Sequence, residues 1–102
     1  MNNTKNIRWG ILGAGKIARA FATDFQYLNG ADLLAIGSRE AQKARGFANE
    51  FAIPQALNYE ELIHHPDIDA VYIATPHSFH FSQASAALQA GKAVLCEKPV
   101  CV

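Results

Sequence analysis

The stretch Arg8–Ala18, Arg-Trp-Gly-Ile-Leu-Gly-Ala-Gly-Lys-Ile-Ala, decides the fold of this chain of 102 residues. Ile7–Leu12 is a largely apolar run of the kind that forms a buried strand. Gly13 and Gly15 follow it directly, and Ala18 completes the pattern G-x-G-x-x-G/A. A buried strand that ends in such a glycine turn predicts a strand–turn–helix unit at the start of an α/β domain.

The helix after this turn is expected to begin at about Lys16, so that its amino end faces the turn. The first glycine permits the turn, the second lets the backbone approach a pyrophosphate, and the small third residue lets helix and strand pack closely. The N–H groups and the positive dipole end of the helix add an anion site. We therefore expect a dinucleotide here, with a turn that binds no ligand as the alternative. The residues expected to contact the dinucleotide are Gly13, Ala14, Gly15, Lys16 and Ile17.

Composition argues against several other classes of function. Nine basic and nine acidic side chains cancel, so the charge indicates neither a nucleic-acid partner nor an anionic membrane surface. No apolar run reaches the ~20 residues that a membrane span requires, and Met1–Asn6 is polar, unlike a secretory signal. Cys96 and Cys101 match neither a zinc spacing nor a C-x-x-C redox pair. We expect two free thiols, no metal site and a cytoplasmic location.

The rest of the chain alternates short apolar runs with helical patterns. Leu33–Gly37, Ala70–Ala74 and Lys92–Cys96 are expected to be strands. Asn58, with Glu61 three residues later, resembles a capping box that opens a short helix. The order of elements predicts an α/β fold of the Rossmann type, a doubly wound parallel sheet with helices on both faces. For the last helix, the spacing predicts an inner face of Phe81, Ala84, Ser85 and Leu88.

Four polar clusters fall at the carboxyl ends of the expected strands. They are Gly13–Lys16, Ser38-Arg39, Thr75–His80 and Glu97-Lys98. In a doubly wound sheet, ligands bind beyond these ends. The coincidence of four clusters therefore favours a ligand site more strongly than any one of them does.

Ser38 and Arg39 predict which dinucleotide binds. A site that favours NAD usually has a carboxylate near the end of the second strand to bind the ribose, and none occurs here before Glu40. A hydroxyl followed by a guanidinium instead suits a 2′-phosphate, because arginine offers forked donors. Lys43, one helical turn beyond Arg39, is expected to add a second positive charge. NADP is the expected cofactor and NAD stays possible; the alternative for Arg39 is a solvated loop residue.

Candidate chemical groups lie in the last two clusters. Lys98 directly follows a buried strand and is expected to donate a proton or hydrogen bond to a substrate oxygen as hydride leaves or arrives. Its alternative is a surface lysine at a strand end. His80 is expected to contact substrate or ribose, with a purely structural place at the start of a helix as an equal alternative.

Together these clusters resemble the motifs of the Gfo/Idh/MocA oxidoreductase family. The matching segments are Gly13–Ala18, Ser38-Arg39, Ala74–His80 and Cys96–Pro99. Glu-Lys-Pro within the last segment is the most specific of them, and the resemblance runs over nearly the whole chain, from residue 7 to about residue 100. Within the family, dihydrodiol dehydrogenase-like members are the most similar.

This resemblance implies a dehydrogenase or reductase that transfers hydride between NAD(P) and a sugar, a polyol or a related hydroxy or carbonyl compound. It implies that Lys98 and His80 lie beside nicotinamide and substrate as the catalytic candidates, and that the Lys98–Pro99 peptide is cis. In such enzymes the other catalytic residues come from a C-terminal α/β domain. The residues that the resemblance places along the cofactor are Thr75, Pro76, His80, Glu97 and Lys98.

The sequence departs from the family by ending at Val102. We expect residues 1–102 to be an N-terminal dinucleotide-binding domain that is incomplete at its C-terminal end and inactive alone. Uncovered apolar surface and an exposed sheet edge are expected to favour self-association. Two other classes stay open. One is a non-catalytic nucleotide-binding or redox-sensing module; the other is a domain that binds S-adenosylmethionine for methyl transfer, in which Glu-Lys-Pro has no role.

Overall fold

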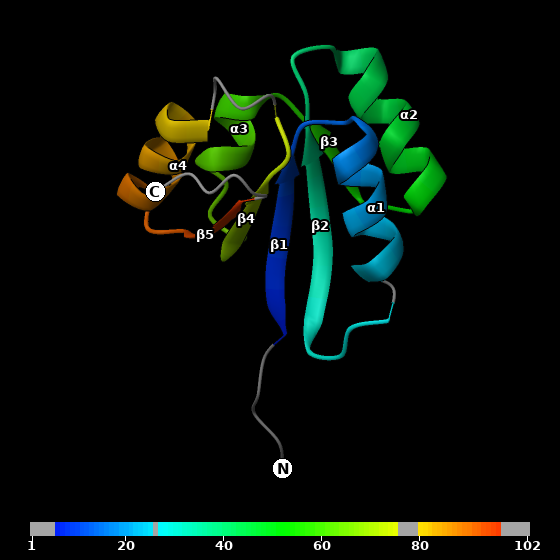
Figure 1. Ribbon diagram of the computed structural model, residues 1–102, viewed down its shortest axis with the longest axis horizontal. Coiled ribbons are helices and arrows are strands. Elements are labelled where there is room, and N and C mark those ends of the chain that lie inside the picture. The colour runs from blue at the N-terminus through cyan, green and yellow to red at the C-terminus, as the bar shows by residue number, and fades with distance from the viewer. Residues whose placement is uncertain (1–5, 26, 76–79, 97–102) are drawn as a thin grey trace.

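A parallel sheet carries the site, and the computed structural model describes it over residues 6–25, 27–75 and 80–96. Its strands are β1 (Ile7–Leu12), β2 (Ala31–Gly37), β3 (Gln55–Leu57), β4 (Ala70–Ile73) and β5 (Ala93–Cys96). The helices are α1 (Lys16–Phe25), α2 (Ala41–Phe51), α3 (Tyr59–Ile63) and α4 (His80–Gln89). The strand order is β3-β2-β1-β4-β5, so the chain winds outward from β1 in both directions (Figure 1). This confirms the predicted doubly wound Rossmann-type fold.

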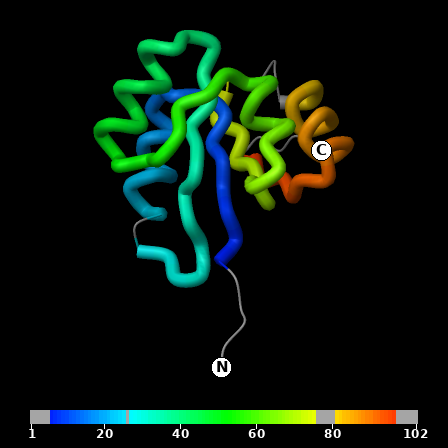
Figure 2. The backbone as a smooth tube through the Cα atoms, turned by 180° about the vertical axis from the view of Figure 1, so that it is seen from behind, coloured from blue at the N-terminus to red at the C-terminus, as the bar shows by residue number. Residues whose placement is uncertain are grey.

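The two faces of the sheet have separate cores. Ile11 of β1 clusters with Phe47 of α2, whereas the next residue, Leu12, clusters with Leu62 of α3 and Ala87 of α4. Because successive strand residues point to opposite faces, β1 contributes to both layers. Figures 1 and 2 show α1 and α2 together to one side of β1, and α3 and α4 to the other.

Aromatic stacking fixes α1 on its face of the sheet. The Phe21 ring lies parallel to the Tyr72 ring of β4, with centroids 3.8 Å apart, and Trp9 of β1 lies 5.9 Å from Phe21. Ala18 is fully buried beneath the first turn of α1. The start of α1 is therefore held close to the end of β1, as the third position of the glycine pattern requires.

The register brings the carboxyl ends of the strands to one edge. Leu12 pairs with Gly37 of β2 and with Ile73 of β4, and Ile73 pairs with Cys96 of β5. The glycine turn and Ser38 each follow directly at this edge. The predicted gathering of polar residues beyond the strand ends is confirmed for these two clusters.

The predicted inner face of α4 is wrong at Phe81 and Leu88. Phe81 and Leu88 are 74% and 60% exposed, whereas Gln83 and Ala87 are buried and Ala84 is half-buried. The apolar residues through which α4 packs on its core are alanines: Ala84, Ala86 and Ala87, with Ala90 just after the helix.

Two further expectations change. The short edge strand β3 was not predicted; it pairs with the end of β2 through only three residues. Cys96 is disulfide-bonded in the structure, contrary to the expected free thiol, and Cys101 lies outside the described residues.

The predicted capping box at the start of α3 is confirmed. Asn58 Oδ1 accepts from the Glu61 N–H (2.7 Å), and Glu61 Oε1 accepts from the Asn58 N–H (3.0 Å). Among the described helices, none is long and apolar enough to cross a membrane.

Candidate functional site

The glycine turn lies where β1, β2 and β4 meet. The Gly13 N–H donates to the Gly37 carbonyl (2.7 Å), and the Ala74 N–H donates to the Leu12 carbonyl (2.8 Å). Gly13 has a φ of 102°, and a Cβ at this position would lie 2.9 Å from the Ala74 carbonyl oxygen. Only glycine lets the turn pack this tightly against the end of β4.

Gly15 and the start of α1 form the open part of the turn. A Cβ built on Gly15 would meet no atom of the described residues within 4 Å, and Gly15 is exposed. The Arg19 N–H donates to the Gly15 carbonyl (3.0 Å), whereas the N–H groups of the first helical turn have no intrahelical acceptor. Lys16 and Ile17 are exposed beside them. The turn presents backbone donors and a positive helix end, which fit the pyrophosphate of a dinucleotide.

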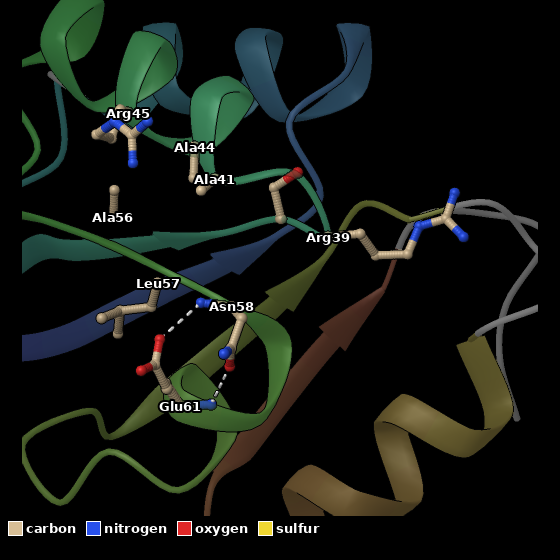
Figure 3. A pocket seen from close by; sticks show the side chains of 9 residues that line it. Arg39, Ala41, Ala44, Arg45, Ala56, Leu57, Asn58 and Glu61 are labelled. Carbon is tan, nitrogen blue, oxygen red and sulfur yellow. Dashed lines mark hydrogen bonds between the residues drawn. The ribbon is translucent and has the colours of Figure 1, made fainter.

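Ser38 is held in place at the end of β2. It is 7% exposed; its N–H donates to the Leu57 carbonyl (3.1 Å), and its Oγ accepts from the Glu40 N–H (3.2 Å). The hydroxyl can still donate its own proton. Arg39 is exposed, and in Figure 3 its side chain extends away from the other labelled residues.

A cavity of about 320 Å³ adjoins Ser38 and Arg39 (Figure 3). Residues from the start of α2, from β3 and from the start of α3 surround it. They are Ser38, Arg39, Ala41, Ala44, Arg45, Ala56, Leu57, Asn58 and Glu61.

The structure brings Arg45, rather than Lys43, to this cavity. Ala41, Ala44 and Arg45 share one face of α2 at i, i+3 and i+4 spacing, and Lys43 lies off that face. Lys43 Nζ instead lies 3.8 Å from Glu40 Oε1, with both side chains exposed. Arg45 was not predicted from the sequence. Its position four residues after Ala41, which places both on one face of a helix, could have indicated it.

Thr75 follows β4 closely and is buried at the same edge. It is 4% exposed, and its hydroxyl donates to Oε1 of Gln83, which is 7% exposed on α4. This hydrogen bond joins the end of β4 to the helix packed against it. Gln83 was also missed from the sequence, because the predicted inner face of α4 excluded it.

Several predicted site residues cannot be placed. Pro76, Glu97, Lys98 and the Lys98–Pro99 peptide lie outside the described residues. His80 is the first residue of α4, and its side chain is not described. The roles of His80 and Lys98 therefore stay predictions. Within residues 6–25, 27–75 and 80–96, no group of three or more histidine, cysteine or acidic side chains is placed to hold a metal ion.

A charged cluster lies at the other end of the strands, away from the glycine turn. Asp69, just before β4, accepts from the Arg8 N–H (2.9 Å) and from Arg8 Nε (3.3 Å). Two hydrogen bonds from Arg8 hold the pKa of the Asp69 carboxyl below its ordinary value. The backbone N–H has the larger effect and the side chain the next largest. The same side-chain hydrogen bond raises the pKa of Arg8. This cluster ties β1 to β4.

Comparison with known proteins identifies the family. Residues 7–102 match the Gfo/Idh/MocA family, described as an oxidoreductase family with an NAD-binding Rossmann fold. The chain belongs to this family. The Gfo/Idh/MocA chain is 43% identical over 97 residues to trans-1,2-dihydrobenzene-1,2-diol dehydrogenase of Mus musculus. It is 39% identical over 94 residues to 1,5-anhydro-D-fructose reductase of Ensifer adhaerens.

These matches cover 92% and 91% of the Gfo/Idh/MocA chain but only 29% and 28% of the two relatives. The chain therefore spans less than a third of their length.

Solved structures of the family bind both dinucleotides. One is a scyllo-inositol dehydrogenase from Lactobacillus casei with bound NAD(H) and scyllo-inositol (TM-score 0.85, 34% identity, covering 93% of this chain and 28% of that one). Another is a 3-ketoreductase from Actinomadura kijaniata with NADP and TDP-benzene (TM-score 0.87, 33% identity, covering 93% and 30%). The predicted family and its class of cofactor are confirmed. The choice between the two dinucleotides depends on this Gfo/Idh/MocA chain's own residues.

Proposed function

We propose that this chain is the dinucleotide-binding part of an oxidoreductase acting between NADP(H) and a sugar, polyol or related hydroxy or carbonyl compound. The observation that carries the proposal is the open glycine turn, where the exposed Gly15 meets the first turn of α1. The proposed dinucleotide-binding domain is residues 1–102, which span less than a third of the length of the relatives. When bound, the dinucleotide supplies or accepts the hydride.

The chain's own residues bind and orient the dinucleotide. N–H groups at the start of α1 donate to the pyrophosphate. Ser38 offers its remaining proton and Arg39 its forked donors to the 2′-phosphate. Glu40 is the first carboxylate after β2, and its side chain is within ion-pair distance of Lys43. This arrangement supports NADP over NAD.

The catalytic assignments extend this proposal. Lys98 follows β5 by two residues and is proposed to donate a proton or hydrogen bond to the substrate oxygen. His80 is proposed to contact the nicotinamide ribose or the substrate. Both depend on the family resemblance and on the position of these residues after β5 and at the start of α4.

Titration calorimetry of the chain with NADPH, NADH and S-adenosylmethionine tests the proposal. We expect NADPH to bind at least about tenfold tighter than NADH, since a charge-assisted contact to the 2′-phosphate contributes roughly 1.5–3 kcal/mol. Arg39→Ala should weaken NADPH binding to the level of NADH. Lys43→Ala is the matched control and should have a smaller effect, because Glu40 lies 3.8 Å from the Lys43 ammonium. Equal affinities for NADPH and NADH would refute the role given to Arg39, and preference for S-adenosylmethionine would refute the oxidoreductase proposal.

Turnover is proposed to require more than this chain, which spans less than a third of its relatives. A steady-state assay with NADP and a panel of sugars and polyols is expected to give none; measurable turnover would contradict that. The alternative, a non-catalytic redox-sensing module, would be favoured if a full-length protein containing this chain also lacked turnover. Balanced charge supports a domain without nucleic-acid or membrane partners. The cytoplasmic location stays a prediction, and the disulfide-bonded Cys96 gives it no support.

A further inference from the structure

Gln83 occupies a position where an amide is unexpected. It lies on the inward face of α4 with alanines, and it is 7% exposed. Its Oε1 accepts from Thr75, but its amide nitrogen has no partner among the residues that the structure describes. A buried amide costs folding free energy unless it is hydrogen-bonded. The Thr75–Gln83 hydrogen bond therefore matters to where the Gln83 side chain lies.

The hydrogen bond of Gln83 leads directly to the glycine turn. Thr75, its partner, is 4% exposed at the end of β4. A Cβ on Gly13 would lie 3.1 Å from the Thr75 nitrogen, so the Thr75 backbone packs against the turn itself. The Ala74 N–H holds the same segment to the Leu12 carbonyl. Gln83, Thr75 and Gly13 thus form a continuous chain of contacts from α4 to the proposed pyrophosphate site.

We propose that Gln83 is a positioning residue for the dinucleotide. This proposal rests on the proposed function. Gln83 holds Thr75, and through Thr75 the end of β4, at the distance from the glycine turn that the bound dinucleotide needs. Gln83 acts through Thr75. The backbone bonds of β4 hold its strand residues, whereas the Thr75 side chain is held by α4.

Calorimetry with NADPH and thermal unfolding, measured on the same variants, tests this inference. Gln83→Met keeps the length and helix propensity of the side chain and removes its acceptor. We expect NADPH to bind about fivefold to tenfold more weakly, the effect of one lost hydrogen bond. Ala87→Ser is the matched control, since it disturbs the same buried face of α4 one turn later and leaves the Gln83 acceptor of Thr75 in place. It should lower the Tm and leave the affinity unchanged.

A second variant covers the case in which loss of the Gln83 acceptor from the buried Thr75 hydroxyl prevents folding. Thr75→Val with Gln83→Met replaces both partners by apolar groups, which is close to neutral for stability, and should weaken NADPH binding at least as much as Gln83→Met. Affinity within twofold of wild type in a folded Gln83→Met or double variant overturns the inference, whatever the change in Tm. Failure of the wild-type chain to bind NADPH overturns the proposed function, and this inference with it.

Discussion

Two glycines in one turn have opposite surroundings. A Cβ on Gly13 would collide with the Ala74 carbonyl, and its φ of 102° is one that side chains rarely adopt. A Cβ on Gly15 would meet no atom within 4 Å in the part of the chain that the structure describes. The first glycine therefore serves the fold, and the second leaves room for a ligand.

Gly13→Ala and Gly15→Ala should separate these roles. Gly13→Ala is expected to destabilise the chain by roughly 1–3 kcal/mol, because the backbone is strained and the methyl group meets β4. Gly15→Ala is expected to leave the Tm within a few degrees of wild type and to abolish most NADPH binding, because its methyl group occupies the approach of the pyrophosphate. Differential scanning calorimetry and titration calorimetry on both variants check the pair. Equal loss of stability in both would show that Gly15 is also structural.

Asp69 predicts a pH dependence at the end of the sheet away from the proposed site. Its pKa is lowered by hydrogen bonds from Arg8, so its carboxylate stabilises the fold above the unfolded value of about 3.9. That contribution is lost as the pH falls through the lower pKa of the folded state. Below about pH 4, the Tm of wild type should fall more steeply than that of Asp69→Asn, in thermal scans across the acid range. Parallel curves of Tm against pH for the two proteins would show that the Arg8–Asp69 interaction does not stabilise the fold. NADPH affinity at pH 7 should be the same in both proteins.

At the scale of elements, the sequence predicted where helices and strands occur better than which face of each is buried. The glycine turn, β1, and the capping box at Asn58 follow from local chemistry, and all three are found. The inner face of α4 depends on how near the helix lies to β4 and β5, which local spacing does not contain. The same limit hid Gln83, which is buried whereas Phe81 is exposed.

In α2, a substitution can test the stability of a helix without changing a proposed ligand contact. Gly46 lies inside this helix, is exposed, and has open space where a Cβ would be. Gly46→Ala should stabilise the chain by about 0.5–1 kcal/mol, because alanine loses less backbone entropy in a helix. Thermal unfolding should show a Tm higher by a few degrees. An unchanged or lower Tm would mean that α2 is not a regular helix at Gly46 in solution.

For the whole molecule, β5 lies at the edge of the sheet and large apolar side chains are exposed near it. Leu95 of β5 is 46% exposed, and Phe81 and Leu88 of α4 are 74% and 60% exposed. With formal charges that sum to zero, little repulsion opposes contact between copies. We predict self-association of the isolated chain that increases with concentration, measured by light scattering. Leu88→Glu should reduce it, and a strictly monomeric wild-type chain at high concentration would contradict the prediction.

The measurement that tests the central claim most directly is an NADPH titration of the isotopically labelled chain, followed by the NMR shifts of its amides. Saturable shifts are predicted for residues 13–18 and 38–40, with Thr75 also shifted and Arg8 and Asp69 unaffected. Shifts confined to other surfaces, or none that saturate, would contradict a dinucleotide site at the glycine turn.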